Sequence, residues 1–244
     1  MSKLFPQLSN KIILAPMAEI TNVAFRLMCK KYGAGLVSTE LLSANAIARE
    51  NNAVLNLAVF DKSEKPLSCQ IFSQNTENLV RAAKVLEKKG FDIIDINFGC
   101  PSKKIIDQGS GGALLKRKNK IAEIVKEVSS SINIPLTVKI RSGFKAKINA
   151  IEIARICEEN GASAITVHAR TVEQGYSGKA DWKVIAEVKK AVKIPVIGNG
   201  DVFNGKDAER MFKETKCDYI IIGRGAIGKP FVFKQINHYL RTGE

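Results

Sequence analysis

Short apolar runs recur along the chain, and segments with helical spacing of apolar residues lie between them. Such alternation predicts parallel strands joined by crossover helices. Some eight strand–helix units in 244 residues match the size and rhythm of a (β/α)8 barrel, the α/β fold also called the TIM barrel. An open doubly wound sheet would more usually have fewer strands and a phosphate loop after its first strand. The predicted strands are Ile12–Leu14, Leu36–Val37, Leu67–Ile71, Ile93–Ile96, Leu136–Ile140, Ala164–Val167, Val196–Ile197 and Tyr219–Ile222.

The segments between the runs carry helix start and stop signals. One helix is predicted behind Thr76, the expected N-cap, and ends at Lys88-Lys89-Gly90. Gly33 and Gly161 likewise end helices just before the next strand. No segment has the composition of a linker, so we expect residues 1–244 to form one barrel domain.

Composition places the chain in an ordinary globular class. Hydrophobic residues make up 45% of it, and no apolar run approaches the roughly 20 residues that span a bilayer. The first residues lack the apolar core of a signal peptide, and the five cysteines are scattered without a disulfide framework. We therefore expect a soluble protein of the reducing cytoplasm that makes no contact with a membrane.

In a (β/α)8 barrel, reactive side chains lie at the carboxyl ends of the strands. The unusual polar and reactive residues of this chain concentrate there, so we expect them to face one pocket. They are Pro16, Met17 and Ala18 after the first strand, Gln70 in the third, Asn97 and Cys100 after the fourth, Lys139 and Arg141 on the fifth, and His168 and Arg170 on the sixth.

Two glycine-rich turns follow the last two strands. They are Gly198-Asn199-Gly200-Asp201 and Gly223-Arg224-Gly225. One such turn would be weak evidence, but barrels commonly bind phosphate at this pair of strand ends. The pair predicts a phosphate site.

Cys100 lies on a short loop at the end of a buried strand. Most free cysteines are buried structural residues. Here the flanking Asn97, Gly99 and Pro101 and the flexible Gly109–Gly112 stretch favour a reactive thiol.

Lys139 and His168 are also candidates for ligand contacts. A lysine inside the strand Leu136–Ile140 is costly unless it meets an anion or a ring oxygen. A lone histidine is often a satisfied core residue, but the place of His168 at a strand end favours function. With two histidines and no Cys-x-x-Cys pair, we expect no zinc or other metal site.

The net charge is +14, from 38 basic and 24 acidic side chains. Such a charge attracts polyanions, and nucleic acid is the first candidate. Arg141 and Arg170 follow strands five and six, so we expect them on the rim that an RNA approaches, in contact with phosphates.

Taken together, the motifs resemble those of the tRNA-dihydrouridine synthases, with order and spacing closest to the bacterial synthase B branch. The resemblance covers nearly the whole chain. The motifs that carry it are Leu14-Ala-Pro-Met-Ala18, Asp95-Ile-Asn-Phe-Gly-Cys-Pro-Ser-Lys-Lys104, Val138-Lys-Ile-Arg-Ser-Gly143, Val167-His-Ala-Arg-Thr171, Ile197-Gly-Asn-Gly-Asp201 and Ile222-Gly-Arg-Gly-Ala226.

The resemblance implies an enzyme with non-covalent FMN at the C-terminal face of the barrel and NADPH as electron source. It reduces the C5–C6 double bond of uridine in tRNA. By the same likeness, Pro16, Met17 and Ala18 line the flavin, and Gln70 and Lys139, with His168, reach its polar edge. The ribityl chain and the phosphate of FMN are expected to contact Asn199, Gly200, Asp201, Gly223 and Arg224.

On the substrate side, the resemblance makes Cys100 the acid that gives a proton to uracil C5. A thiol near its reference pKa of about 8.5 is mostly protonated at neutral pH. Asn97 is expected to bond the uracil edge, and Lys103 and Lys104 to meet RNA phosphates. The uridine must flip out of the tRNA to reach the barrel mouth, and Tyr176 is expected either to stack on a base or to pack in its loop.

The chain departs from the family pattern at two places. Glu19 and Asn22 stand where the first motif usually has glycine and aspartate. Family members normally carry a helical tRNA-binding domain after the barrel, and Phe231–Leu240 reads as the last barrel helix. We therefore expect the catalytic barrel alone.

Three alternatives remain open. The chain could be an FMN barrel acting on a small pyrimidine in the manner of dihydroorotate dehydrogenases, a dihydrouridine synthase acting on ribosomal RNA, or an RNA-binding module with a vestigial barrel. The overall charge argues against the first. Intact Cys100, Lys139 and both glycine turns argue against the third. The sequence leaves the modified uridine, the preference for NADPH over NADH and the oligomeric state open.

Overall fold

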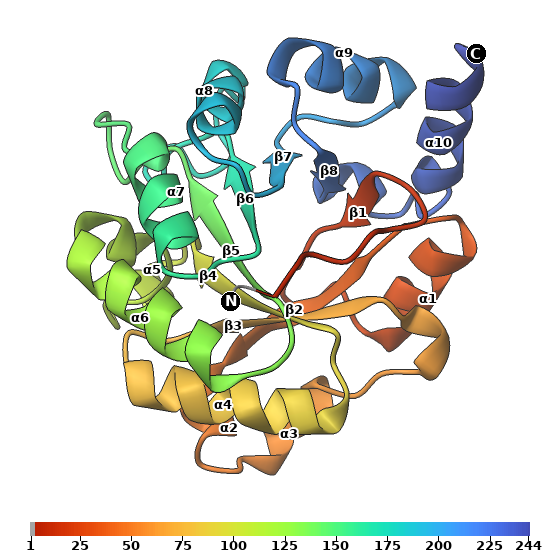
Figure 1. Cartoon of the computed structure of the whole chain (residues 1–244). Coiled ribbons are helices and arrows are strands. Elements are labelled where there is room, and N and C mark those ends of the chain that lie inside the picture. Colours follow the sequence, from red (N-terminus) through yellow and green to blue (C-terminus); the bar gives the residue numbers. More distant parts are fainter. Residues whose placement is uncertain (1–2) are drawn as a thin grey trace.

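The computed structural model describes residues 3–244, and in it eight parallel strands form one sheet wrapped into a barrel (Figure 1). The (β/α)8 prediction is thereby confirmed. The strands are β1 (Ile12–Leu14), β2 (Val37–Ser43), β3 (Leu67–Phe72), β4 (Ile93–Phe98), β5 (Leu136–Arg141), β6 (Ala164–His168), β7 (Val196–Asn199) and β8 (Tyr219–Ile222).

The ring of strands closes between β1 and its two neighbours. β1 pairs with β8 in the register Ile12 to Ile220. On the other side a parallel bridge joins Ile13 to Leu36, and the Leu14 amide donates to the Leu36 carbonyl at 2.9 Å. Closure brings the carboxyl ends of all the strands to one face.

Helices follow every strand and surround the barrel (Figure 1). Within residues 3–244, none is long and apolar enough to cross a membrane. They are α1 (Val23–Lys31), α2 (Ala44–Ile47), α3 (Asn52–Leu57), α4 (Thr76–Lys89), α5 (Lys103–Ile106), α6 (Lys118–Ser131), α7 (Ala150–Glu159), α8 (Lys183–Ala191), α9 (Gly205–Thr215) and α10 (Val232–Thr242), with the 3₁₀ turns η1 (Lys62–Glu64), η2 (Gly111–Lys116) and η3 (Arg224–Ala226).

Strand alternation separates an outer core from the barrel interior. In β4, Ile94, Ile96 and Phe98 belong to the large cluster packed under the helices, whereas Ile93 belongs to a small interior cluster. Because successive side chains point to opposite faces of a strand, Asp95 and Asn97 share the inward direction of Ile93.

The interior therefore changes from apolar to polar toward the carboxyl ends of the strands. Ile13, Ile93, Ala164 and Ile197 are among the residues that form its apolar cluster. Above them the strand registers align polar residues side by side in successive layers, which are Gln70, Asp95 and Thr137; Asn97 and Lys139; and Arg141, His168 and Asn199.

One predicted helix start is wrong by one residue. Asn75, not Thr76, caps α4, because its side chain accepts from the Asn78 amide at 2.9 Å. Thr76 is the first helical residue, and its hydroxyl bonds Glu123 of α6 instead. At the other end Gly90 takes the left-handed conformation with φ 95°, as its position predicts.

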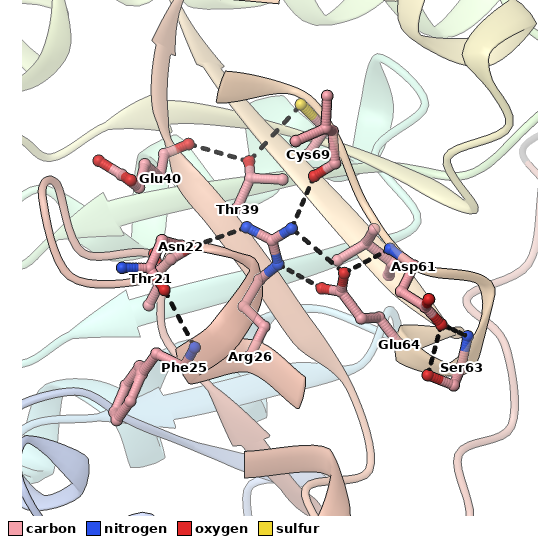
Figure 2. A network of polar contacts seen from close by, with 12 residues as sticks. Thr21, Asn22, Phe25, Arg26, Thr39, Glu40, Asp61, Ser63, Glu64 and Cys69 are labelled. Atoms are coloured by element: carbon pink, nitrogen blue, oxygen red, sulfur yellow. Dashed lines mark hydrogen bonds and ion pairs between the residues drawn. The ribbon is translucent and has the colours of Figure 1, made fainter. Parts of the chain in front are cut away.

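A buried ion pair fixes α1 and the β1–α1 loop to the loop before β3. The side chains of Arg26 and Glu64 are 1% and 0% exposed. The Arg26 guanidinium bonds the Glu64 carboxylate and donates to the Thr21 carbonyl at 2.7 Å (Figure 2). Glu64 also accepts from the Asp61 amide at 2.7 Å. Thr21 in turn bonds the backbone of Met17, so the pair supports the first loop at the barrel mouth.

Removing the anion of this pair should destabilise the protein strongly. Glu64→Ala leaves the Arg26 charge buried without compensation, and we expect the free energy of unfolding to fall by about 3–5 kcal/mol. Urea denaturation measures it. The matched control is Glu77→Ala, which breaks the exposed Arg81–Glu77 pair (62% and 69% exposed) and should leave the urea midpoint essentially unchanged. Equal effects in the two variants would contradict the role given to burial.

Candidate active site

The carboxyl ends of the strands surround a cavity of about 430 Å³, a volume in the range of cofactor pockets. Lys103, Lys104 and Arg170 are not among its lining residues. The other predicted site residues line it and thus come together as expected: Pro16, Met17, Ala18, Gln70, Asn97, Cys100, Lys139, Arg141, His168, Asn199, Gly200, Asp201, Gly223 and Arg224.

Lys139 reaches across the barrel to Asn199. Its Nζ donates to Asn199 Oδ1 at 2.9 Å, and Asn199 Nδ2 donates to the Ile221 carbonyl at 2.8 Å, which fixes the amide with its oxygen toward the lysine. Burial lowers the pKa of Lys139 to about 8, and nearby Arg141 acts in the same direction. The partner is an amide rather than a carboxylate, so this contact does not neutralise the ammonium.

His168 lies beside these cations as a neutral imidazole. Burial lowers its pKa far below the ordinary value, and the charges of Lys139, Arg141, Arg170 and Arg224 lower it further. The ring can therefore donate one hydrogen bond and accept another, but it does not add a positive charge.

Cys100 is held with its thiol at the cavity. Asn97 Oδ1 accepts from the Gly99 amide at 2.9 Å and from the Cys100 amide at 2.7 Å. The Gly112 amide donates to the Cys100 carbonyl at 3.0 Å. Gly111 packs beside it at φ 57°, where an added Cβ would lie 3.1 Å from the Cys100 Cβ.

Burial raises the pKa of the Cys100 thiol above its ordinary value. A hydrogen bond from the Ser102 backbone and the charges of Arg141 and Lys139 oppose this shift without reversing it. Lys103 and Lys104, close in sequence, are exposed on α5 and do not contribute to this shift. The thiol is thus protonated at neutral pH. The other four cysteines are free and buried.

The prediction that Arg141 lies on an exposed rim is wrong. Its side chain is 3% exposed and folds back along the cavity wall. Nε donates to the Gly99 carbonyl at 2.9 Å, and Nη1 donates to the carbonyls of Thr171 at 2.9 Å and Gly175 at 2.7 Å. Burial accordingly lowers its pKa to about 10. Arg141 remains a cation that lines the cavity.

Arg170 is also misplaced by the rim prediction, and a direct RNA contact for it is wrong. It is 2% exposed, and it makes two parallel hydrogen bonds to Asp201, at 2.9 and 2.8 Å. Its other contacts are the Ser177 and Gly178 carbonyls. A guanidinium with these partners cannot reach a phosphate in solvent, so its role is to hold Asp201.

Asp201 in turn positions Arg224. Its carboxylate accepts from Arg224 at 3.0 Å and from the Ala180 amide at 2.8 Å. The hydrogen bonds and the arginine charges keep its pKa low, against the effect of burial. Of the two arginines, only Arg224 lines the cavity and is partly exposed, at 42%.

The β7 turn requires glycine at position 200. Gly200 has φ 122°, and an added Cβ would lie 2.8 Å from the Ala180 Cβ. Its carbonyl accepts from Trp182 Nε1 at 2.9 Å. The turn therefore packs directly against the loop after β6.

Tyr176 stands at the mouth with 59% of its surface exposed. The guanidinium carbons of Arg141 and Arg224 lie 5.6 and 5.1 Å from its ring centroid. The ring is therefore held by two cations and lies over the cavity rather than in a core.

Both departures in the first motif have a structural consequence. Glu19 adopts φ 64°, a left-handed conformation in which glycine carries no strain. Asn22 caps α1 by accepting from the Phe25 amide at 3.0 Å, a role that aspartate also fills.

Sequence reasoning missed two groups at this site. One is an apolar wall of Ile20, Leu41, Val202, Phe203 and Ile227, whose residue types carry no chemical signal. The other is Asp95, buried beneath the cavity with hydrogen bonds from Gln70 and Thr137. Its inward position two residues before Asn97 could have revealed it.

The arrangement suits an anionic, partly apolar ligand placed next to an acid. Lys139, Arg141 and Arg224 supply positive charge, the apolar wall supplies a surface for a ring, and Cys100 brings a thiol whose pKa is raised. In the part of the chain that the structure describes, no cluster of three or more His, Cys, Asp or Glu side chains could hold a metal ion.

Comparison with known proteins connects this geometry to a family. The sequence model described as Dihydrouridine synthase (Dus) matches residues 13–244. A probable tRNA-dihydrouridine synthase of Rickettsia bellii is 42% identical over 240 residues, which are 98% of this chain and 74% of that protein. The tRNA-dihydrouridine synthase B of Pseudomonas putida is 39% identical over 238 residues, 97% of this chain and 71% of that protein.

A solved structure agrees in fold. It is a 2-naphthoyl-CoA reductase in complex with 2-naphthoyl-CoA, with a TM-score of 0.72 and 15% sequence identity over 95% of this chain. This chain spans 50% of that structure's length, and at such identity the likeness concerns the barrel alone.

The family match confirms the resemblance carried by the sequence motifs, and it covers the segments that build the cavity. The chain therefore belongs to the dihydrouridine synthase family and is an oxidoreductase.

Proposed function

We propose that the protein is a tRNA-dihydrouridine synthase that reduces the C5–C6 double bond of uridine in tRNA, with FMN as resident cofactor and NADPH as electron source. The observation that carries the proposal is the meeting of a protonated thiol, Cys100, with a cation-lined cavity at the carboxyl ends of the strands. The relatives described above, which are named as tRNA-dihydrouridine synthases, agree with it.

The residues present fit FMN. Its phosphate and the polar edge of its ring carry negative charge or accept hydrogen bonds, and the cavity offers Lys139, Arg224 and Gln70. In this proposal Pro16, Met17 and Ala18 line the ring, Gln70, Lys139 and His168 meet its polar edge, and Asn199, Gly200, Gly223 and Arg224 take ribityl and phosphate, with Asp201 holding Arg224. When bound and reduced by NADPH, FMN would supply the hydride that uracil C6 accepts.

Cys100 completes the reduction by giving its proton to C5. An acid must be protonated before the reaction, and burial raises the pKa of this thiol. The Asn97 bonds to the Gly99 and Cys100 amides hold the loop, so the proton is presented at one place. Asn97 keeps one amide N–H for a uracil oxygen, and Arg141 lies on the same wall.

The charge of the chain suits an RNA substrate. The net charge is +14, and Lys103 and Lys104 are exposed on the helix that follows the Cys100 loop. They can meet phosphates while a flipped uridine enters the cavity. The exposed face of Tyr176 at the mouth offers a stacking surface for a base.

The first test is turnover on RNA. Incubation with unmodified tRNA and NADPH should produce dihydrouridine, detected by mass spectrometry. Because phosphate contacts release counterions, kcat/KM should fall at least about tenfold between 50 and 200 mM salt. Ribosomal RNA and orotate are assayed in parallel. Turnover of orotate but not of tRNA would replace the proposal with a small-pyrimidine enzyme.

The second test concerns Lys139. Its pKa in the folded protein is about 8 against an ordinary 10.5, so the unfolded chain binds more protons in this window and stability should rise as pH rises from about 8 to 10.5. Lys139→Met removes the buried charge with little change of volume. We expect the cofactor-free variant to be more stable at pH 7 and to lose this pH dependence.

The same variant should bind FMN at least about tenfold more weakly, the effect of losing roughly one charge-assisted hydrogen bond. Flavin fluorescence titration measures the affinity, and urea denaturation measures the stability. Lys116→Met, outside the cavity, is the control. Unchanged FMN affinity in Lys139→Met would show that Lys139 does not meet the ring edge.

The third test separates the two half-reactions. Cys100→Ala removes only the acid, so the protein should fold, bind FMN and accept electrons from NADPH at a near-normal rate. Uridine reduction should slow by about 10²- to 10⁴-fold. Rapid-mixing absorbance follows both steps, and Cys157→Ala, at a buried cysteine of α7, is the control. Collapse of the NADPH step with intact uridine reduction would exclude the proton-donor role.

A further inference from the structure

A chain of hydrogen bonds runs under the cavity from Asp95 to the Cys100 loop. Gln70 Nε2 donates to Asp95 Oδ2 at 2.6 Å, and Asn97 Nδ2 donates to Gln70 Oε1 at 2.9 Å. Asn97 Oδ1 then accepts from the amides of Gly99 and Cys100. The chain links β3 and β4 to the loop that carries the thiol.

The direction of this chain is determined at both ends. Backbone amides can only donate, so the oxygen of Asn97 must face Gly99 and Cys100, and its nitrogen must face Gln70. At the other end an ionised carboxylate can only accept, so the nitrogen of Gln70 must face Asp95. Each amide side chain is thus held in one of its two orientations, and the two ends demand the same one.

Asp95 is well placed to act as the fixed end. It is 7% exposed, and Thr137 donates to its second oxygen at 2.6 Å, which ties it to β5. Burial raises its pKa, whereas the bonds from Thr137 and Gln70 and the charge of Lys139 oppose that shift. Both oxygens accept, so the carboxylate has no freedom to turn.

We propose that Asp95 is a positioning residue that orients Gln70 and Asn97 and thereby keeps the Cys100 loop closed at the cavity. It does not itself line the cavity, and it acts on the Cys100 loop through the two amides. A second consequence follows at the cavity, because Gln70 and Asn97 both line it. Each keeps one further N–H, so the chain presents donors there and favours ligands with carbonyl oxygens.

The proposal is tested first through the reactivity of Cys100, which needs neither cofactor nor substrate. The other four cysteines are at most 5% exposed, so iodoacetamide reports on Cys100 in the folded protein. Burial raises the thiol pKa only while the loop stays closed. Asp95→Ala leaves the Gln70 nitrogen without its hydrogen-bond acceptor and should loosen the Cys100 loop. The alkylation rate at pH 7.5 should then rise about tenfold, the change expected for a thiol pKa lower by one unit.

Two variants control for charge and for general loss of stability. Asp95→Asn retains an oxygen for Gln70, and its new amide can donate to the Thr137 hydroxyl, so alkylation should stay near the wild-type rate. Thr137→Val removes a buried hydrogen bond to Asp95 but leaves the chain to Cys100 intact, and it should also stay near wild type. Fast alkylation in either variant, or wild-type alkylation in Asp95→Ala, would overturn the proposal.

If Asp95→Ala does not fold, Gln70→Met breaks the chain at its middle link while Asp95 keeps its bond from Thr137. Gln70→Met should raise the alkylation rate of Cys100 to a similar extent. An unchanged alkylation rate would contradict the proposed hydrogen-bond chain.

The last step of this inference, a slower proton transfer to uracil, rests on the proposed function. Asp95→Ala should therefore slow uridine reduction at least about tenfold with little effect on electron uptake from NADPH. The two measurements fail independently. Wild-type protein that leaves tRNA unmodified would contradict the proposed function alone, whereas turnover by the wild type with unchanged alkylation in Asp95→Ala would contradict the positioning role alone.

Discussion

Positive charge buried at the mouth of the barrel is the constraint around which the site is organised. Lys139 and Arg141 project from one strand into the interior, where an ion without partners is strongly unfavourable. Neutral hydrogen-bond acceptors lower this cost of burial. Lys139 donates to an amide oxygen, and Arg141 donates to backbone carbonyls. Hydrogen bonds are thereby satisfied while the charge is not cancelled. A cavity walled in this way selects a ligand that brings negative charge.

The same cations determine the protonation of their neighbours. Burial keeps His168 neutral, and the cations reinforce this because a further positive charge beside them would be repelled. They also favour the thiolate of Cys100, but burial outweighs them and the thiol stays protonated. A more open loop would shift that balance. The acid therefore depends on loop packing, at Gly111 and Asn97, as much as on the nearby charges.

Much of this arrangement follows from the sequence, because strand order and the period of two decide which residues meet. Gln70, Cys100, Lys139 and Asn199 converge on one cavity because the carboxyl ends of parallel strands share a face. The course of a long side chain does not follow from its position. Arg141 and Arg170 stand at strand ends, yet they turn inward. Their partners are backbone carbonyls of the folded loop after β6 and the carboxylate of Asp201 after β7, and only the folded chain brings these together. The start of α4 is a second example. Both Asn75 and Thr76 are residue types that can cap a helix, and only the backbone geometry of the folded chain decides which of them does.

The polar layers above the apolar interior explain why one strand position matters to another. Asp95 orients Gln70, and Gln70 orients Asn97, so the buried carboxylate sets the hydrogen-bonding direction of the two amides beside the cavity. The series ends at the cavity, where the last amide donors and the uncancelled charge of Lys139 face a ligand. A ligand with carbonyl oxygens accepts from the amide donors, and its negative charge offsets the charge of Lys139. The binding free energy of such a ligand adds to the stability of the folded state.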